Sequence, residues 1–336
     1  MALLEVEGLN VVYQPERGVR IKAVRDIDLT LEKGEFVGIV GESGSGKSTL
    51  GFAITHMLRP PASIQGGSVR FNGTNILELN GSELRVQRRN GFALVLQSGM
   101  NALNPVRSVV KQLGDILKAH AQKGERWSKT KVRDRAVELL SMVDLDPQVL
   151  DRYPHELSGG MRQRVAIALA LALEPELIVF DEPTTALDVI VQASVMETIK
   201  SLQQNRGFTA ILISHDMSVV LDATDRTLVM YAGRIVEDQP SKAMVTGGMH
   251  HPYTEALMKC YADPRADKVE LKDIDGMPPD LSLEMIACAF APRCEFAREV
   301  CHEKIPKLRR SGLAQVACHV RLPDPEVVQE EEIVGG

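Results

Sequence analysis

A chain of 336 residues is long enough for one large domain or two modest ones with a sizeable core. The composition, 44% hydrophobic and 25% charged, is that of an ordinary globular protein, and the net charge of −6 argues against nucleic acid as a main partner. Glu5 and Glu7 interrupt any apolar leader, so export is not expected. The longest apolar run, Val165 to Leu173, is nine residues, about half a membrane span, so no crossing of a bilayer is expected.

The N-terminal stretch predicts two strands followed by a third. Residues 4–13 and 24–31 alternate apolar and polar positions, and the second stretch ends at a turn over residues 32–35. Phe36 to Val40 then reads as a short buried strand. Tyr13 closes its strand, where an aromatic ring either covers a sheet edge or stacks on a nucleotide base.

A glycine-rich stretch follows the third predicted strand. Residues 41–48 read Gly-Glu-Ser-Gly-Ser-Gly-Lys-Ser and fit G-x-x-x-x-G-K-[ST], the phosphate-binding P-loop. In such a loop the backbone N–H groups surround phosphate oxygens, and the following helix points its positive dipole end at the same anion. Lys47 is expected to reach the β- and γ-phosphates, and Ser48 to ligate Mg²⁺. A plain strand-to-helix turn is disfavoured, because a strand precedes the motif and Thr49 to Ile54 opens a helix after it.

The middle of the chain changes character. Phe92 to Leu96 predicts a buried strand that ends at Gln97, and the region from about 98 to 157 carries apolar residues at helical spacing. We interpret this region as a helical insertion in a strand-rich framework. It ends at residues 157–163, Leu-Ser-Gly-Gly-Met-Arg-Gln, after which a helix is predicted from Arg164 to Leu173.

Polar residues end two further predicted strands. The apolar run from Leu177 is followed by Asp181 and Glu182, at the carboxyl end where α/β proteins place Mg²⁺-binding groups. A solvated turn is the alternative for two adjacent acids. After a helix from Ile190 to Arg206, the strand 209–213 leads to Ser214 and His215. A lone histidine is more often structural, but here it follows the third strand that ends on a polar group suited to phosphate chemistry.

Taken together, these motifs resemble the ATP-binding subunits of ABC transporters over residues 4–320. Walker A is residues 41–48, the Q-loop is Gln97, the signature motif is 157–163, Walker B is 177–181 followed by Glu182, the D-loop is 186–188 and the switch histidine is His215. The resemblance implies an α/β P-loop NTPase with a RecA-like core, an antiparallel β subdomain, a helical insertion and a cysteine-containing C-terminal extension. It places the nucleotide-binding domain at 1–249, with the insertion at about 98–157, the extension at 250–322 and an acidic tail at 323–336.

The resemblance also implies ATP hydrolysis, with ATP and Mg²⁺ as cofactors. Glu182 would be the general base, His215 would contact the γ-phosphate, and Gln97 would join them in catalysis. Mg²⁺ would be held by Ser48, Gln97 and Asp181. The residues implied to bind nucleotide are Tyr13, Gly41, Ser43, Gly44, Ser45, Gly46, Lys47, Ser48 and Thr49, with Ser158, Gly159, Gly160 and Asp188. In the family two domains face head to tail, so that Ser158 and Gly160 would complete the ATP site of a partner.

A narrower resemblance is to the dipeptide, oligopeptide and nickel importers, and among them to the first of two paired ATPase subunits. It rests on Leu103-Asn104-Pro105, on residues 183–189 and on His251-Pro252-Tyr253-Thr254. One departure is at 98–102, where the family usually has Asp-Pro after the glutamine. This segment borders the groove that should receive a membrane subunit, so it bears on which permease is the partner.

This narrower resemblance implies a subunit that powers import of a peptide-like solute. Its partners would be a second, paralogous ATPase, two membrane permeases and, indirectly, an extracytoplasmic solute-binding protein, with no nucleic acid. Its location would be the cytoplasmic face of the membrane. Import of an oligosaccharide or of nickel is the alternative, and an ABC ATPase outside transport is a remote one. The solute itself is not encoded in an ATPase subunit.

Four of the five cysteines, Cys288, Cys294, Cys301 and Cys318, lie in the last fifty residues. Such crowding without an export signal favours metal or redox chemistry over disulfides. The spacing C-x5-C-x6-C-x16-C matches neither a zinc ribbon nor a ferredoxin, so it leaves iron–sulfur, zinc, simple thiols and disulfides open. The peptide-importer branch carries a similar element at 288–294, and this resemblance implies a [4Fe–4S] cluster. A regulatory or assembly role for the C-terminal region is a further hypothesis, compatible with transport.

Overall fold

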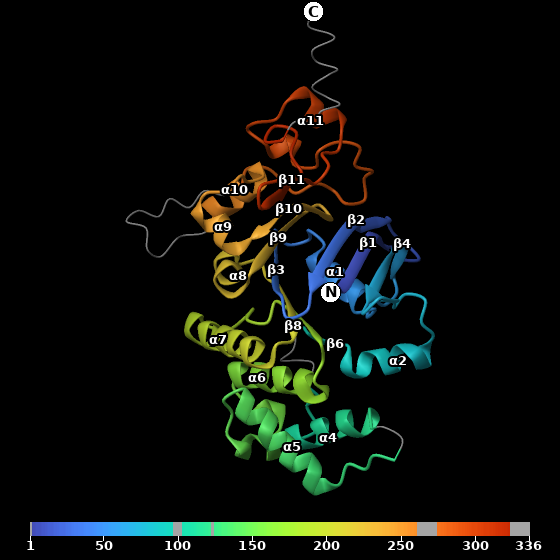
Figure 1. The fold of residues 1–336 in the computed structure, drawn as a ribbon, viewed down its shortest axis with the longest axis vertical. Helices are drawn as coiled ribbons and strands as arrows, with labels where there is room; N and C mark the ends of the chain where they lie inside the picture. Colours follow the sequence, from blue (N-terminus) through green and yellow to red (C-terminus); the bar gives the residue numbers. More distant parts are fainter. Residues whose placement is uncertain (1, 97–102, 122–123, 261–273, 323–336) are drawn as a thin grey trace, which may run out of the picture. The chain divides into compact units, whose positions relative to one another are not determined.

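A computed structural model describes residues 2–96, 103–121, 124–260 and 274–322 (Figure 1). The chain divides into two compact units that interleave along the sequence. The first unit consists of Met1–Leu3, Leu31–Phe36 and Phe71–Leu212. The second consists of Leu4–Thr30, Val37–Arg70 and Ile213–Gly336. The boundary predicted near residue 249 comes from the sequence resemblance and not from the compactness of the fold, and it stays a prediction.

In the first unit, neighbouring strands follow the order β8 (Thr209–Ile213), β7 (Leu177–Asp181) and β6 (Phe92–Val95). β6 and β7 are parallel, with Phe92 opposite Leu177. β7 and β8 are buried along their whole length, which explains why both read as continuous apolar runs and not as alternating patterns. A short strand, β5 (Thr74–Asn75), also belongs to this unit. The strands predicted at residues 92–96, from Leu177 and at residues 209–213 are confirmed as β6, β7 and β8.

The helices of the first unit include the predicted insertion. α2 (Gly81–Asn90) precedes it, and α4 (Val109–Ala119) and α5 (Lys129–Met142) form it. A β-carbon on Gly114 of α4 would lie 3.1 Å from Val132 of α5, so the two helices pack closely. Short 3₁₀ turns at Pro147–Asp151 and Pro154–Glu156 follow.

The helix predicted from Arg164 begins earlier than expected. α6 spans Gly159–Ala170 and is continued by a 3₁₀ turn at Leu171–Leu173. Ser158 is the N-cap, and its hydroxyl accepts a hydrogen bond of 3.3 Å from the Met161 N–H. The apolar periodicity starts only at Val165, and glycine disfavours helices, so periodicity alone placed the start too late. The next helix, α7 (Val189–Arg206), agrees with its prediction within one residue.

The second unit contains two groups of strands. β2 (Ile21–Glu32), β1 (Ala2–Tyr13) and β4 (Ala62–Phe71) are neighbours in that order. The other group runs β11 (Arg309–Ser311), β12 (Ala314–Val316), β10 (Arg234–Pro240), β9 (Arg226–Tyr231) and β3 (Phe36–Val40). β3 pairs with β9 in parallel. The pairs β9–β10, β10–β12 and β12–β11 are antiparallel. β9 and β10 form a hairpin, whose turn residues Ala232 and Gly233 both have positive φ.

The helices of the second unit are short. They are α1 (Lys47–Ile54), α8 (Met217–Ala223), α9 (Ser241–Thr246), α10 (Pro252–Lys259) and α11 (Glu299–Glu303), with a 3₁₀ turn at Ala291–Arg293. In the described parts of the chain, no helix combines the length and apolar character that a membrane span requires.

A buried carboxylate connects β10 to the segment that begins the C-terminal extension. Glu237 has no exposed surface, and its oxygens lie 2.8 Å from His250 Nδ1 and accept a 2.7 Å hydrogen bond from the His251 N–H. Hydrogen bonding to Glu237 raises the pKa of His250, whereas burial lowers that of His251 to about 3. A carboxylate without water needs such partners, so this contact specifies how residues 250 and 251 meet the strand.

Candidate nucleotide site

The P-loop of the second unit adopts a backbone that only glycine tolerates at two positions. Gly41 has φ 150°, and a β-carbon there would lie 2.2 Å from the Met230 carbonyl oxygen. Gly46 has φ 102°, and its β-carbon would lie 2.2 Å from the Ala23 carbonyl oxygen. Both contacts are with backbone atoms, which cannot swing away. The motif glycines are therefore required by sterics as well as by any ligand.

The side chain of Lys47 folds back over the P-loop toward the start of the loop. Its side chain is buried, and Nζ donates hydrogen bonds of 2.7 Å to the Gly41 carbonyl and 2.9 Å to the Glu42 carbonyl. α1 begins at Lys47, and its N-cap, Gly46, offers no side-chain acceptor to the first-turn N–H groups. The positive end of the helix and the ammonium group thus lie on the same short loop, an arrangement suited to a phosphate.

The other predicted nucleotide residues of this unit lie around the loop. Ser43 and Gly44 are exposed at its tip, Ser48 is half-buried, and Ser45 and Thr49 are buried. Tyr13, at the end of β1, has its hydroxyl 3.1 Å from the Thr49 hydroxyl. This hydrogen bond places the predicted base-stacking ring beside the first turn of α1. Its stacking role stays a prediction.

His215 follows β8 and belongs to the second unit, where it is exposed. The Ser214 N–H beside it donates to the Ile39 carbonyl at 3.1 Å, which ties this segment to β3, the strand that leads into the P-loop. Asp216 then caps α8 by accepting hydrogen bonds from the N–H groups of Ser218 and Val219. The second unit therefore brings together the P-loop, Tyr13 and the segment of His215.

The acidic pair belongs to the first unit. Asp181 ends β7 and is buried, whereas Glu182 is half-buried and has φ 50°, a left-handed conformation that is uncommon for a glutamate. The Thr185 hydroxyl donates a 2.6 Å hydrogen bond to the Glu182 carboxylate. This bond fixes the direction of the side chain, and strained backbone of this kind is typical of functional sites. The predicted base is thus held in a defined orientation.

The signature and D-loop residues meet at the starts of two helices of the first unit. A β-carbon on Gly160 would lie 2.5 Å from Cγ1 of Val191, so the start of α6 packs against the start of α7. Ser158 caps α6, and Asp188 caps α7 by accepting a 3.0 Å hydrogen bond from the Val191 N–H. Ser158 and Asp188 are both exposed, and Gly159 and Gly160 are half-exposed. The structure thus brings Ser158, Gly159, Gly160 and Asp188 together on one surface.

The structure does not describe every predicted site residue, and it divides the described ones between the two units. Gln97 and residues 98–102 lie outside the described residues. The P-loop belongs to the second unit and the acidic pair to the first, so each half of the site is described within its own unit.

The four C-terminal cysteines gather in the second unit as free thiols. The Cys288 N–H donates to the Cys301 carbonyl at 3.0 Å. Burial, with a smaller contribution from the charges of Cys301 and Cys318, raises the pKa of Cys288 to about 11. Burial likewise raises the pKa values of Cys294 and Cys318, which also interact with Cys301. Even so, no group of three or more His, Cys, Asp or Glu side chains in the described residues is arranged to hold a metal ion.

Cys260, the fifth cysteine, is half-buried at the end of α10. Its thiol donates a 3.3 Å hydrogen bond to the Ala256 carbonyl. It stands apart from the other four in the chain and serves below as a control position.

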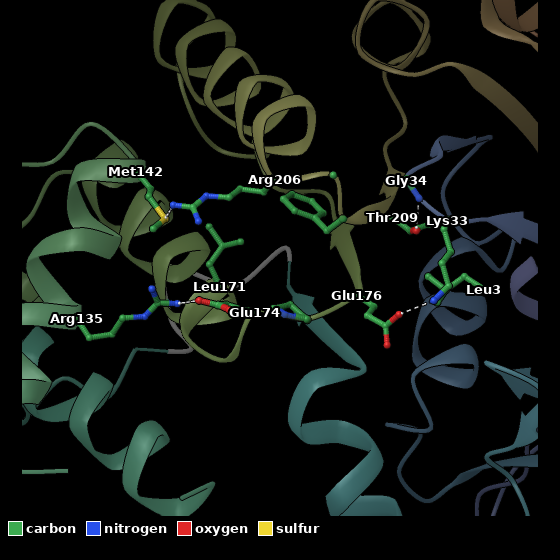
Figure 2. A pocket seen from close by; sticks show the side chains of 13 residues that line it. Leu3, Lys33, Gly34, Arg135, Met142, Leu171, Glu174, Glu176, Arg206 and Thr209 are labelled. Carbon is green, nitrogen blue, oxygen red and sulfur yellow. Dashed lines mark hydrogen bonds and ion pairs between the residues drawn. The ribbon is translucent and has the colours of Figure 1, made fainter. Parts of the chain in front are cut away.

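A cavity of about 300 Å³ in the first unit lies at the opposite ends of β7 and β8 from Asp181 (Figure 2). Its polar side chains pair with one another, Arg135 with Glu174 at 2.7 Å and Lys33 with Glu176 at 3.0 Å. In α/β proteins ligands bind at the carboxyl ends of the strands, and this cavity lies at the amino ends. It is therefore not the nucleotide site.

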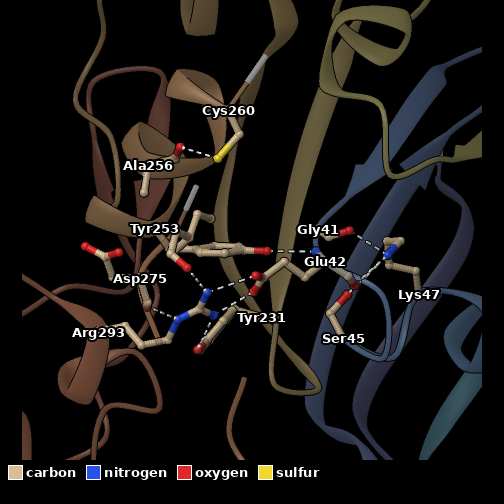
Figure 3. A network of polar contacts seen from close by, with 11 residues as sticks. Gly41, Glu42, Ser45, Lys47, Tyr231, Tyr253, Ala256, Cys260, Asp275 and Arg293 are labelled. Atoms are coloured by element: carbon tan, nitrogen blue, oxygen red, sulfur yellow. Dashed lines mark hydrogen bonds and ion pairs between the residues drawn. The ribbon is translucent and has the colours of Figure 1, made fainter. Parts of the chain in front are cut away.

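Arg293 and Glu42 form a contact that sequence patterns did not predict. Arg293 of the extension binds both carboxylate oxygens of Glu42, the second residue of the P-loop (Figure 3). Arg293 directly precedes Cys294 in the cysteine-containing element, and Glu42 occupies a variable position of the P-loop motif. Neither residue has a periodic or motif signal that would relate it to the other.

Sequence and structure comparisons agree with one another. The ABC transporter family profile matches residues 24–185, and that of the oligopeptide/dipeptide transporter C-terminal region matches residues 236–301. The chain is 40% identical over 320 residues, 95% of this chain and 97% of the relative, to the dipeptide transport ATP-binding protein DppD of Caldanaerobacter subterraneus. It is 38% identical over 327 residues to the DppD of Escherichia coli, covering 96% and 98%.

Among solved structures, the chain resembles the dimeric post-hydrolysis state of the ATP-binding cassette MJ0796 bound to ADP and Pi. The TM-score is 0.63 at 30% identity, with 71% of this chain and 98% of that chain covered.

Proposed function

Because the chain belongs to the family of ABC transporter ATP-binding proteins, we propose that it hydrolyses ATP to power the import of a peptide-like solute through a membrane permease. The predicted fold class is confirmed, since its structural relatives are ABC ATPase cassettes. The observation that carries the import role is the match of residues 236–301 to the oligopeptide/dipeptide transporter C-terminal region, in a chain that spans nearly the whole length of dipeptide transport relatives.

Within this proposal, the P-loop binds the nucleotide phosphates. Lys47 would leave the Gly41 and Glu42 carbonyls, or share its donors with them, to reach the β- and γ-phosphates. The backbone of Gly44 and Gly46 would contribute further donors, and Tyr13 would stack on the adenine. The geometry supports this assignment because the loop combines a helix N-terminus, an ammonium group and glycines in conformations that other residues rarely adopt.

Mg²⁺ fits the oxygen donors that this chain offers. Asp181 supplies a buried carboxylate at the end of β7, Ser48 supplies a hydroxyl in the first turn of α1, and Gln97 is the third proposed ligand. Such hard oxygen ligands suit Mg²⁺, which when bound neutralises charge on the phosphates. Glu182, held by Thr185, would orient and polarise the attacking water, and His215 would contact the γ-phosphate.

The second ATPase is proposed as the partner that completes the site. Ser158, Gly159, Gly160 and Asp188 lie together and accessible in the first unit, and Val189 and Ile190 beside them are 82% and 84% exposed. Exposed apolar side chains next to a helix N-terminus suit a surface that another cassette covers while it delivers a phosphate. The structural relative is a dimer, which supports the same reading.

The remaining partners follow from the import role. We propose two membrane permeases, an indirectly coupled extracytoplasmic binding protein and a position at the cytoplasmic face of the membrane. The second ATPase is proposed to be a paralogue. The names of the relatives as transport proteins support this assembly.

The import role is tested by reconstituting the chain with its co-purifying permeases and second ATPase in lipid vesicles. We expect ATP turnover to rise several-fold when the binding protein is loaded with a short peptide, because a loaded receptor favours closure of the ATPase pair. The same binding protein offered nickel or an oligosaccharide is the control. If nickel or an oligosaccharide stimulates ATP turnover and peptides do not, the proposed solute is wrong. If ATP turnover is the same with and without the permeases, the transport role is contradicted.

For Cys288, Cys294, Cys301 and Cys318 we retain the proposal of a [4Fe–4S] cluster, with zinc as the alternative. Their convergence and mutual electrostatic influence support it, whereas the described side chains are not arranged as metal ligands. After anaerobic purification we expect about four iron atoms per chain with visible absorbance. Cys294→Ser should lower the iron content, and Cys260→Ser should leave it unchanged. Colourless protein that contains zinc would select the alternative, and protein with neither metal would reject both.

A further inference from the structure

The C-terminal extension reaches the P-loop through one buried ion pair. Arg293 Nη1 lies 2.8 Å from Glu42 Oε2, and Nη2 lies 3.0 Å from Oε1 (Figure 3). The Arg293 side chain is 4% exposed and that of Glu42 24% exposed. Two parallel N–H···O bonds give such a pair both strength and a fixed geometry. The extension therefore holds the side chain of the second P-loop residue in one orientation.

Arg293 is itself held in place by its own segment and by β9. Its Nε donates to the Asp275 carbonyl at 2.9 Å, and Nη2 donates to the Ile274 carbonyl at 3.1 Å. Nη1 also donates to the Tyr231 hydroxyl at 3.2 Å. Hydrogen bonding to Glu42 raises the pKa of Arg293, so the guanidinium stays charged. Because all these acceptors are fixed by backbone or packing, the guanidinium has little freedom to follow a moving loop.

A second contact joins the extension to the backbone of the same residue. The Glu42 N–H donates a 2.8 Å hydrogen bond to the Tyr253 hydroxyl. Tyr253 is fully buried, and its ring packs against Tyr231 and Phe290 with centroids 4.5 Å and 5.4 Å apart. Burial raises the pKa of Tyr253, so its hydroxyl stays neutral and can accept this bond. Side chain and backbone of Glu42 are thus both tied to residues after position 249.

Glu42 matters for the nucleotide because of its charge and its carbonyl. Its carbonyl and that of Gly41 accept the hydrogen bonds of Lys47. Its carboxylate sits on a loop built to receive a polyanion, where an unbalanced negative charge would repel phosphate. Pro278, Pro279 and Leu281 of the extension line a small pocket together with residues 42–45. The extension therefore both covers this side of the loop and supplies its counter-charge.

We propose that Arg293 is a positioning residue of the ATP site, by which the C-terminal extension neutralises Glu42 and holds the P-loop in the conformation that receives phosphate. This inference rests on the proposed nucleotide role of residues 41–48. It gives the extension a direct part in nucleotide affinity.

The test uses the full-length chain and measures its dissociation constant for Mg·ATP, with KM and kcat of the assembled transporter. Arg293→Gln keeps an amide donor on a shorter side chain but loses the charge, and we expect it to weaken ATP binding by about tenfold or more. KM should rise accordingly, with kcat within about twofold. The matched control is Arg321→Gln, which removes another arginine–carboxylate pair of the extension, 2.6 Å from Glu255. It should leave the dissociation constant within about twofold.

Rescue separates this role from a merely structural one. The double variant Arg293→Gln with Glu42→Gln should recover most of the lost affinity, because the repelling carboxylate is gone. Arg293→Lys keeps the charge but not the two parallel hydrogen bonds, so its affinity should lie between those of Arg293→Gln and the unchanged chain. It is the variant to measure if Arg293→Gln does not fold. Unchanged affinity of Arg293→Gln or of Arg293→Lys, failure of the double variant to recover, or a loss in Arg293→Lys as large as that in Arg293→Gln would each overturn the proposal.

Lys47→Ala distinguishes failure of this inference from failure of the proposed function. If Lys47→Ala abolishes Mg·ATP binding while Arg293→Gln does not change it, only the role of Arg293 is wrong. If Lys47→Ala leaves binding intact, the P-loop assignment itself fails.

Discussion

Replacing Glu182 by glutamine should lower ATP turnover at least tenfold, because general acid–base groups contribute roughly 10²–10⁴-fold. Glutamine keeps the size of the side chain and an oxygen that can accept the Thr185 hydrogen bond, now 2.6 Å to the carboxylate. It cannot take a proton from water. Affinity for Mg·ATP should therefore persist while hydrolysis stops, which phosphate release and equilibrium nucleotide binding measure separately.

The control for this variant lies at the other end of the same strand. Glu176 directly precedes β7 and pairs with Lys33 at 3.0 Å, with 42% of its side chain exposed. An exposed pair of this kind contributes about 0–1 kcal/mol. Glu176→Gln should thus keep turnover within about twofold. A fall of less than tenfold in Glu182→Gln would remove Glu182 as the base.

Ser158→Ala is expected to reduce turnover of the assembled ATPase pair by about tenfold or more, because a donor aimed at the partner's phosphate disappears. The chain's own affinity for Mg·ATP should not change, since residues 41–48 hold that nucleotide. The variant also loses the N-cap hydrogen bond of 3.3 Å from the Met161 N–H, worth about 1 kcal/mol of stability. Turnover in the pair and nucleotide binding by the single chain are the two measurements.

Ser128→Ala separates loss of a helix cap from loss of the signature hydroxyl. Ser128 is also an exposed N-cap serine of the first unit, and it accepts a 3.2 Å hydrogen bond from the Lys131 N–H at the start of α5. Both variants should lower thermal stability by similar amounts, but only Ser158→Ala should slow hydrolysis. Equal turnover in the two variants would show that Ser158 does not serve a partner's site.

The sequence by itself determined the elements whose functional residues follow one another in a short stretch of chain. The P-loop was predictable because Gly41, Gly46 and Lys47 follow a buried strand in a fixed order, and their backbone demands are local. β7 was predictable with its exact bounds, since a strand buried on both faces is a run of apolar residues that ends where the acids begin. The start of α6 was missed because its signal is the cap at Ser158 and not an apolar period.

Only the tertiary structure decided which distant residues act together. Glu42 and Arg293 are 251 positions apart, and Tyr253 reaches the same loop residue from another helix. Such pairs are set by how buried segments pack, which leaves no period or motif in either stretch of sequence. The same holds for Glu237, whose burial is tolerable because residues 250 and 251, together with Gln239, supply donors. The phosphate loop could therefore be read from eight consecutive residues, whereas its connection to the C-terminal extension required the packed chain.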